Sequence, residues 1–152
     1  MFTDIVGSTE KLASLGDAGW ASRLQSHAAI VQDGMQRYDG RLVKSTGDGV
    51  LATFAGPARG VDAARWILET LHSADLDARA GLHVGEIELL GDDIAGHAVH
   101  VAARVMAQAD GGEVLVSRTV RDLTAGSGLR FTDRGTHALK GIPEDWQLYA
   151  LA

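Results

Sequence analysis

Phe2-Thr3-Asp4-Ile5-Val6-Gly7-Ser8-Thr9 opens this chain as a short apolar strand that runs straight into a Gly-Ser-Thr turn. The turn begins a helical segment, so the strand ends beside a helix N-terminus. A second stretch, Lys44-Ser45-Thr46-Gly47-Asp48-Gly49, forms the tip of a predicted hairpin. If the two strands are neighbours in one sheet, the carboxylates of Asp4 and Asp48 converge. Paired oxygen ligands beside a helix N-terminus are suited to hold a divalent metal and a nucleotide triphosphate together.

The composition indicates one domain, residues 1–152, with 45% hydrophobic and 22% charged residues. A chain of this length buries about 70% of its unfolded surface. No membrane span or signal segment is recognisable, and the absence of cysteine excludes disulfides, so we expect a cytoplasmic protein. The net charge of −6 argues against a nucleic-acid partner but not against a nucleotide substrate, because bound metal ions reverse the local sign. Met1 stands almost inside the first strand, so we expect the natural polypeptide to extend upstream, where a regulatory domain is possible.

Hydrophobic periodicity and turn residues predict an alternation of strands and helices. The expected strands are 1–6, 41–46, 50–54, 79–90, 113–116, 129–132 and 146–150, and the expected helices start at Ser8, Pro57, His97 and Ser117. Gly16 and Gly19 are expected to divide the first helical region, and Gly85-Glu86 to mark a bulge or hairpin. The order predicts an α+β sandwich with a ferredoxin-like βαββαβ core, additional C-terminal strands and helices over one sheet face.

Each aspartate also has a purely structural explanation. Asp4 is favourable beside the positive end of a helix, and Asp-Gly is common in two-residue hairpin turns, which on its own would account for Asp48. A ferredoxin-like sheet, however, places the first strand next to the hairpin strand that follows Asp48. Two carboxylates there can bridge ions about 3.5–4 Å apart, so together they favour a metal site.

A third stretch, Asp93-Ile94-Ala95-Gly96, leads into a helix that carries Arg104. The simplest interpretation is an acidic loop followed by an alanine-rich packing helix with a solvent-facing arginine. His97 and His100 are three residues apart on that helix, but no cysteine or acidic residue at helical spacing supports a zinc site.

Taken in order, these stretches resemble the catalytic domain of class III nucleotide cyclases, and most of all the bacterial, actinobacterial-type adenylyl cyclases. The resemblance extends through Leu139-Lys140-Gly141-Ile142-Pro143 and so covers nearly the whole chain. It implies a head-to-tail homodimer in which both chains build each active site.

The resemblance also implies a role for each matching residue. Asp4 and Asp48, with the carbonyl of Ile5, would bind two Mg²⁺ or Mn²⁺ ions. The β- and γ-phosphates of ATP would lie on the turn formed by Val6, Gly7, Ser8 and Thr9. The partner chain would supply Lys44 and Asp93 for the base, Arg104 for the reacting phosphate and Lys140 for the terminal phosphates.

The choice of base follows from hydrogen-bond chemistry. Adenine presents an acceptor at N1 and a donor amine at N6, which match a lysine and an aspartate, whereas guanine presents the opposite pattern. Unpaired buried polar groups penalise the wrong base. The prediction is therefore an adenylyl cyclase, which forms 3′,5′-cyclic AMP and pyrophosphate by two-metal-assisted attack of the ribose 3′-hydroxyl on the α-phosphate. Arg104 would stabilise the charge that develops on the phosphate.

One position departs from the family pattern. His100 stands four residues before Arg104, where the family usually has an asparagine that orients the ribose. A neutral imidazole donates or accepts one hydrogen bond, so it replaces the amide only in part. This leaves open a catalytically weak or silent cyclase-like module that binds nucleotide and dimerises. A diguanylate cyclase is disfavoured, since Thr46-Gly47-Asp48-Gly49 carries a single acid.

Overall fold

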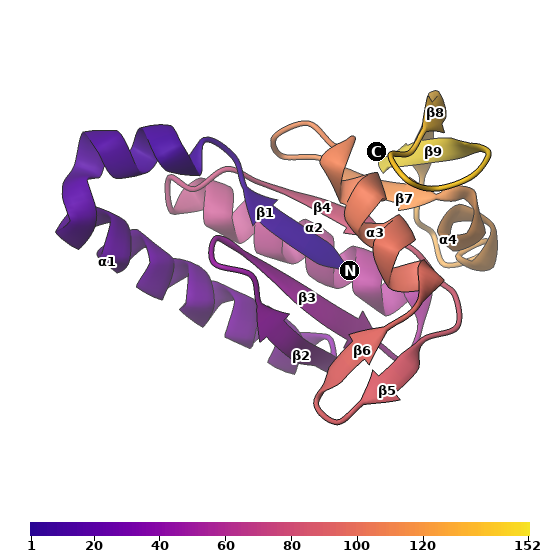
Figure 1. Ribbon diagram of the computed structural model, residues 1–152, viewed down its shortest axis with the longest axis horizontal. Coiled ribbons are helices and arrows are strands. Elements are labelled where there is room, and N and C mark those ends of the chain that lie inside the picture. The colour runs from indigo at the N-terminus through magenta and orange to yellow at the C-terminus, as the bar shows by residue number, and fades with distance from the viewer.

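The computed structural model describes all residues 1–152. Figure 1 shows the elements in space. The strands are β1 (Phe2–Ile5), β2 (Gly40–Ser45), β3 (Gly49–Phe54), β4 (Ala78–Leu82), β5 (Glu88–Leu90), β6 (Asp93–Ala95), β7 (Val114–Ser117), β8 (Phe131–Ala138) and β9 (Asp145–Leu151). The helices are α1 (Ser8–Arg37), α2 (Pro57–Ser73), α3 (His97–Ala107) and α4 (Arg118–Leu123). No helix is both long enough and apolar enough to cross a bilayer.

Seven strands form one sheet in the order β2-β3-β1-β4-β7-β9-β8. Its first four strands have the order and the antiparallel pairing of β1 with β3 and β4 that a ferredoxin-like core requires. The α+β fold with additional C-terminal strands is therefore confirmed. The sheet is extended on the β4 side, where β7 pairs in parallel with β4 and β9 joins β7 to β8.

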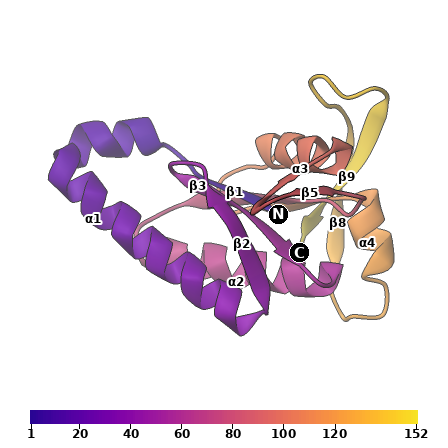
Figure 2. The ribbon, with the colours of Figure 1, turned by 60° about the horizontal axis from the view of Figure 1, so that its bottom comes forward.

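The sheet is covered on both faces, and the expectation that helices cover only one is wrong. One core lies under α1 and α2 and includes Val31, Ile67 and Val116. The other lies under α3 and includes Val105 and Leu115, and Figure 2 shows α3 on the side opposite α2. The physical reason is visible in β7, where every residue is buried, so the centre of the sheet has no polar face to leave in water.

The expected break of the first helical region into two helices is confirmed at Gly16 but not at Gly19. Gly16 has φ 71° and ψ 175°, outside the helical region, whereas Gly19 continues the helix. The segment before the bend therefore turns away from the rest of α1 (Figure 1). Trp20 and Leu24, which follow the bend, pack against the core under α1 and α2.

The predicted strand over residues 79–90 is wrong in its second half. The chain leaves the sheet after Leu82, and β5 instead pairs with β6 in a separate two-stranded hairpin, so Asp93 begins a strand and not a loop. A Cβ on Gly85 would lie 2.7 Å from the Cβ of Ala98, so a glycine is needed where the chain passes α3. A Cβ on Gly81 would lie 2.2 Å from the backbone nitrogen of Met106, which shows how closely α3 lies on β4.

Candidate active site

The pairing of β1 with β3 brings the two predicted metal carboxylates together. Asp4 is the cross-strand partner of Gly49, and the Ile5 N–H donates to the Asp48 carbonyl oxygen at 3.0 Å. Gly49 allows this approach, because a Cβ there would lie 2.0 Å from the carbonyl oxygen of Thr3. The expectation that the two strands are neighbours is therefore confirmed.

The two carboxylates influence each other. Partial burial, and then the negative charge of Asp48, raise the pKa of Asp4 above its ordinary value, although Arg79 opposes the shift. Two acids that repel each other at the end of a strand provide a favourable place for a cation. No group of three or more histidine, cysteine or acidic side chains could hold a metal in this chain. A cation at Asp4 and Asp48 would therefore need backbone or substrate oxygens, which suits Mg²⁺, usually bound by one or two carboxylates and phosphates.

Arg79 is a site residue that the sequence reasoning missed. Its Nη2 lies 3.2 Å from Asp4 Oδ2, and its Nη1 donates to the carbonyl oxygens of Ala107 and Ala109 at 3.3 and 3.4 Å. The register of β1 on β4 makes Arg79 the direct cross-strand neighbour of Asp4. Ile5 lies in the core under α1 and α2, so by strand alternation Asp4 points to the face of the sheet that α3 covers.

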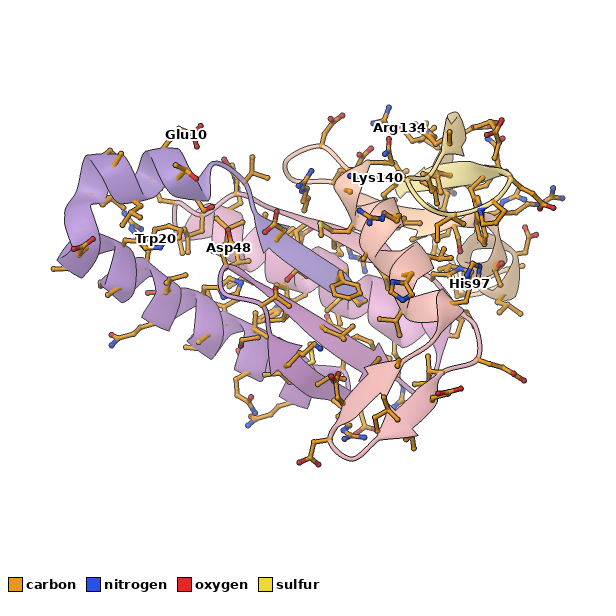
Figure 3. The ribbon with its side chains drawn as sticks, in the orientation of Figure 1. Glu10, Trp20, Asp48, His97, Arg134 and Lys140 are labelled. Atoms are coloured by element: carbon orange, nitrogen blue, oxygen red, sulfur yellow. The ribbon has the colours of Figure 1, made fainter.

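The turn after β1 has the features of an anion-binding helix start. Gly7 has φ 67° and precedes α1 without a side-chain cap, so the first N–H groups of the helix are free. An open cleft of about 320 Å³ lies beside this turn, and its lining includes Ser8, Thr9, Trp20 and Asp48. Figure 3 shows Asp48 and Trp20 within the bend of α1. The structure therefore places the predicted phosphate turn next to the carboxylate pair.

The predicted base-reading residues contact each other although they are 49 positions apart in the sequence. Lys44 Nζ, at the end of β2, lies 3.0 Å from Asp93 Oδ2, at the start of β6. Asp93 Oδ1 accepts a 2.7 Å hydrogen bond from the Ile94 N–H. The hydrogen bond from Lys44, followed by that from the backbone, lowers the pKa of Asp93, so a charged donor and a charged acceptor stand side by side.

The three remaining predicted residues are exposed and have no hydrogen-bond or ion-pair partner through their side chains; they are His100 and Arg104 on α3 and Lys140 in the turn before β9. Lys140 follows Leu139, which is buried with Val105 in the core under α3. The turn and the helix therefore form one packed unit that presents two cations. None of these side chains bonds to Asp4 or Asp48, and Figure 3 shows Lys140 at α3 and Asp48 beside α1.

Comparison with known proteins now assigns the family. The family model "Adenylate and Guanylate cyclase catalytic domain" matches residues 1–152, and the chain belongs to this family. The class III cyclase resemblance is thus confirmed.

Several relatives are bacterial. "Putative adenylate cyclase 3" of Rhizobium meliloti is 33% identical over 114 residues, which cover 69% of this chain and 19% of that protein. An uncharacterized Mycobacterium tuberculosis protein is 34% identical over 124 residues, covering 80% of this chain and 33% of its own. This chain thus spans a third or less of the length of these relatives. The adenylate/guanylate cyclase/hydrolase structure from Silicibacter pomeroyi is 26% identical, with a TM-score of 0.87 and coverage of 98% and 92%.

Proposed function

We propose that this domain is an adenylyl cyclase that converts ATP to 3′,5′-cyclic AMP and pyrophosphate at sites shared across a head-to-tail homodimer. One observation carries the proposal: neither Asp4 nor Asp48 pairs with Arg104 or Lys140, two exposed cations that find no partner within their own chain. A second copy can bring such cations to the phosphates held at the carboxylates.

The carboxylates of Asp4 and Asp48, with the carbonyl oxygen of Ile5, would hold two Mg²⁺ or Mn²⁺ ions. When bound, these ions would supply Lewis acidity at the ribose 3′-hydroxyl and the phosphates. The backbone of residues 6–9 would accept the β- and γ-phosphates at the N-terminus of α1. Arg79 would then exchange its contact with Asp4 for a phosphate oxygen, because its guanidinium lies at the edge of the same site.

The partner chain would hold the base and the reacting phosphate. The Lys44–Asp93 pair presents a donor and an acceptor, the pattern that adenine N1 and N6 require. Arg104 would stabilise the negative charge on the α-phosphate, and His100 would orient the ribose in place of an asparagine. Lys140 would contact the terminal phosphates and the departing pyrophosphate.

A second copy is also supported by exposed apolar side chains. The β5–β6 hairpin exposes Leu89 at 67% and Leu90 at 57%, and Leu42 of β2 and Val6 of the phosphate turn are exposed as well. Exposed large apolar side chains close in sequence to predicted site residues are typical of an interaction surface. We propose that the partner subunit covers them.

The direct test is a cyclic AMP assay with ATP and Mn²⁺ over a range of protein concentrations. If dimerisation assembles the site, activity per chain rises with concentration and reaches a plateau, as the dimer fraction does. Turnover that stays constant per chain while the protein is monomeric by light scattering would contradict the shared site.

A catalytically silent nucleotide-binding module is the second candidate, and His100 is the observation that favours it. Replacing His100 by Asn restores the residue that the family resemblance leads us to expect at this position. We expect His100→Asn to raise turnover with little change in ATP affinity, because an amide offers both a donor and an acceptor at shorter reach. Single-turnover kinetics at saturating ATP would measure this. His97→Asn, one turn earlier and also exposed, serves as the control and is expected to change nothing.

A further inference from the structure

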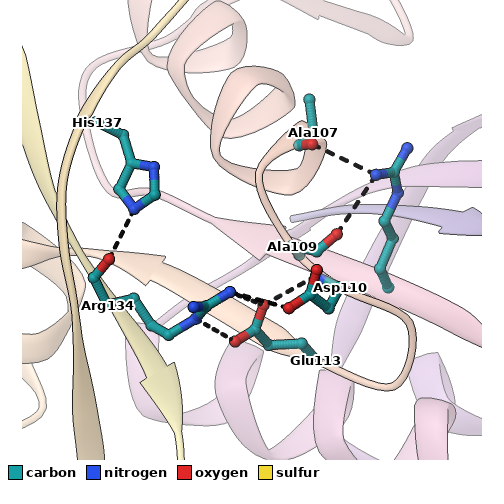
Figure 4. A network of polar contacts seen from close by, with 7 residues as sticks. Ala107, Ala109, Asp110, Glu113, Arg134 and His137 are labelled. Atoms are coloured by element: carbon teal, nitrogen blue, oxygen red, sulfur yellow. Dashed lines mark hydrogen bonds and ion pairs between the residues drawn. The ribbon is translucent and has the colours of Figure 1, made fainter.

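Arg134 is the most heavily bonded side chain outside the predicted site. It lies in β8, and its Nε and Nη2 donate to Glu113 Oε1 and Oε2 at 2.7 and 3.3 Å. Nη2 also donates to Asp110 Oδ2 at 3.0 Å. Both acids belong to the turn between α3 and β7 (Figure 4). The Glu113 side chain is only 15% exposed, so the forked contact is partly shielded from water and stronger than an ordinary surface ion pair.

Arg134 occupies an irregularity of the strand. The register of β8 on β9 shifts between Asp133 and Thr136, and Gly135 between them has φ 80°. The residues in this bulge leave the regular ladder, which turns the Arg134 side chain toward the α3–β7 turn. The main chain is held as well, because His137 Nε2–H donates to the Arg134 carbonyl oxygen at 2.7 Å.

Beyond the bulge, β8 leads directly to the predicted phosphate lysine. The last cross-strand pair joins Ala138 to Asp145, and the residues between them, which include Lys140, form the connecting turn. Within this turn the Ile142 N–H donates to the Leu139 carbonyl oxygen at 3.0 Å, and Leu139 is 3% exposed. The direction in which β8 leaves the bulge therefore sets where Lys140 stands.

The α3–β7 turn, which carries the two acids that Arg134 contacts, is itself held in place by hydrogen bonds. The α3–β7 turn begins at Ala107 and Ala109, whose carbonyl oxygens accept hydrogen bonds from Arg79. Glu113 Oε2 also accepts from the Asp110 N–H at 2.9 Å, which closes the turn on itself. Arg134 thus ties the bulge of β8 to a turn that cannot move freely against the sheet.

We propose that Arg134 is a positioning residue: its clamp on Glu113 and Asp110 fixes the bulge of β8 and thereby directs Lys140 to the terminal phosphates of the nucleotide. The inference rests on the proposed function of Lys140. Loss of the clamp leaves Lys140 chemically intact but frees its hairpin, so its contacts with substrate weaken through mispositioning.

A double-mutant cycle tests the proposal. Arg134→Met keeps the apolar stem and removes the fork, and we expect it to raise the KM for ATP about tenfold, the loss of one charge-assisted contact. In a Lys140→Ala background the same substitution should add nothing to KM, because Arg134 acts through Lys140. Arg134→Lys keeps the charge without the fork, so its KM for ATP should lie between the KM of wild type and that of Arg134→Met. Arg118→Met breaks the 3.4 Å pair with Asp122 on α4 and should leave KM unchanged.

The same cycle can be measured without turnover, through the Kd of a fluorescent ATP analogue. Equal effects of Arg134→Met with and without Lys140 would overturn the positioning role, and so would an unchanged KM and Kd. If Arg134→Met does not fold, Glu113→Gln removes the clamp from the other side and completes the cycle. A wild-type protein that binds nucleotide without forming product would contradict the proposed catalysis. The double-mutant cycle measured through Kd would in that case still decide whether Arg134 positions Lys140. No nucleotide binding at all would overturn both.

Discussion

Asp4→Asn is expected to lower cyclase turnover by on the order of 100-fold or more, the scale of losing a central electrostatic contact. The amide keeps the shape of the carboxylate but lacks the charge that a divalent cation requires. Initial-rate kinetics with Mn²⁺ would measure the loss. Asp62→Asn is the matched control, because Asp62 is also paired with an arginine, Arg65 at 2.7 Å, but lies on α2 away from the site.

The same substitution should stabilise the cation-free protein. Because the pKa of Asp4 is raised in the folded state, the folded chain binds a proton more readily than the unfolded chain. The contribution of Asp4 to stability is therefore greatest below the ordinary carboxyl pKa, about 3.9, and is lost as the pH rises through the raised value. Asn removes this loss, so Asp4→Asn should have a higher Tm than wild type at neutral pH.

A bound divalent cation should offset the repulsion between the carboxylates of Asp4 and Asp48. We expect Mn²⁺ to raise the Tm of wild type and of Asp62→Asn, but not of Asp4→Asn. A lower Tm for cation-free Asp4→Asn, with an undiminished response to Mn²⁺, would show that Asp4 is only the structural partner of Arg79.

Lys44→Glu with Asp93→Gly is expected to convert the proposed preference for ATP into a preference for GTP. The glutamate accepts from guanine N1, and the glycine removes an acceptor that repels guanine O6. Each hydrogen bond gained with guanine, or left unmade with adenine, is worth about 1–3 kcal/mol once the base is buried. The ratio of kcat/KM for the two nucleotides should therefore shift by about 100-fold or more.

A control is needed because the double variant also removes an ion pair. Arg59→Glu with Asp39→Gly removes a comparable exposed pair, 3.1 Å apart, between α2 and the turn before β2. It should leave the nucleotide preference unchanged. An unaltered preference for ATP in the Lys44→Glu, Asp93→Gly protein would refute the assignment of these residues to the base.

The ferredoxin-like core was predictable because its determinants are local. Gly-Ser-Thr after β1 and Gly-Asp-Gly between β2 and β3 fix the turns, and the order of elements then fixes the strand order. The neighbouring positions of Asp4 and Asp48 follow from that order alone. The additional C-terminal strands were also predicted, although β8 extends to Ala138, beyond the expected end at residue 132.

What escaped prediction depends on register and on packing between distant elements. Arg79 becomes a neighbour of Asp4 only through the pairing of β1 with β4, and Arg134 meets Glu113 only because β8 has a bulge. The position of α3 on the second face depends on Gly81, which lets the helix backbone approach β4. Periodicity along one segment contains none of this information.

The most direct test mixes two inactive chains. Asp4→Asn lacks a predicted metal carboxylate. Arg104→Ala lacks the predicted transition-state cation and should lose turnover on the order of 1,000-fold. If each site takes Asp4 from one chain and Arg104 from the other, a mixed dimer contains one doubly impaired site and one intact site. We predict that an equimolar mixture recovers a substantial fraction of wild-type cyclic AMP formation, whereas neither variant alone does. A mixture that forms dimers by mass spectrometry yet stays as inactive as its components would contradict the shared site.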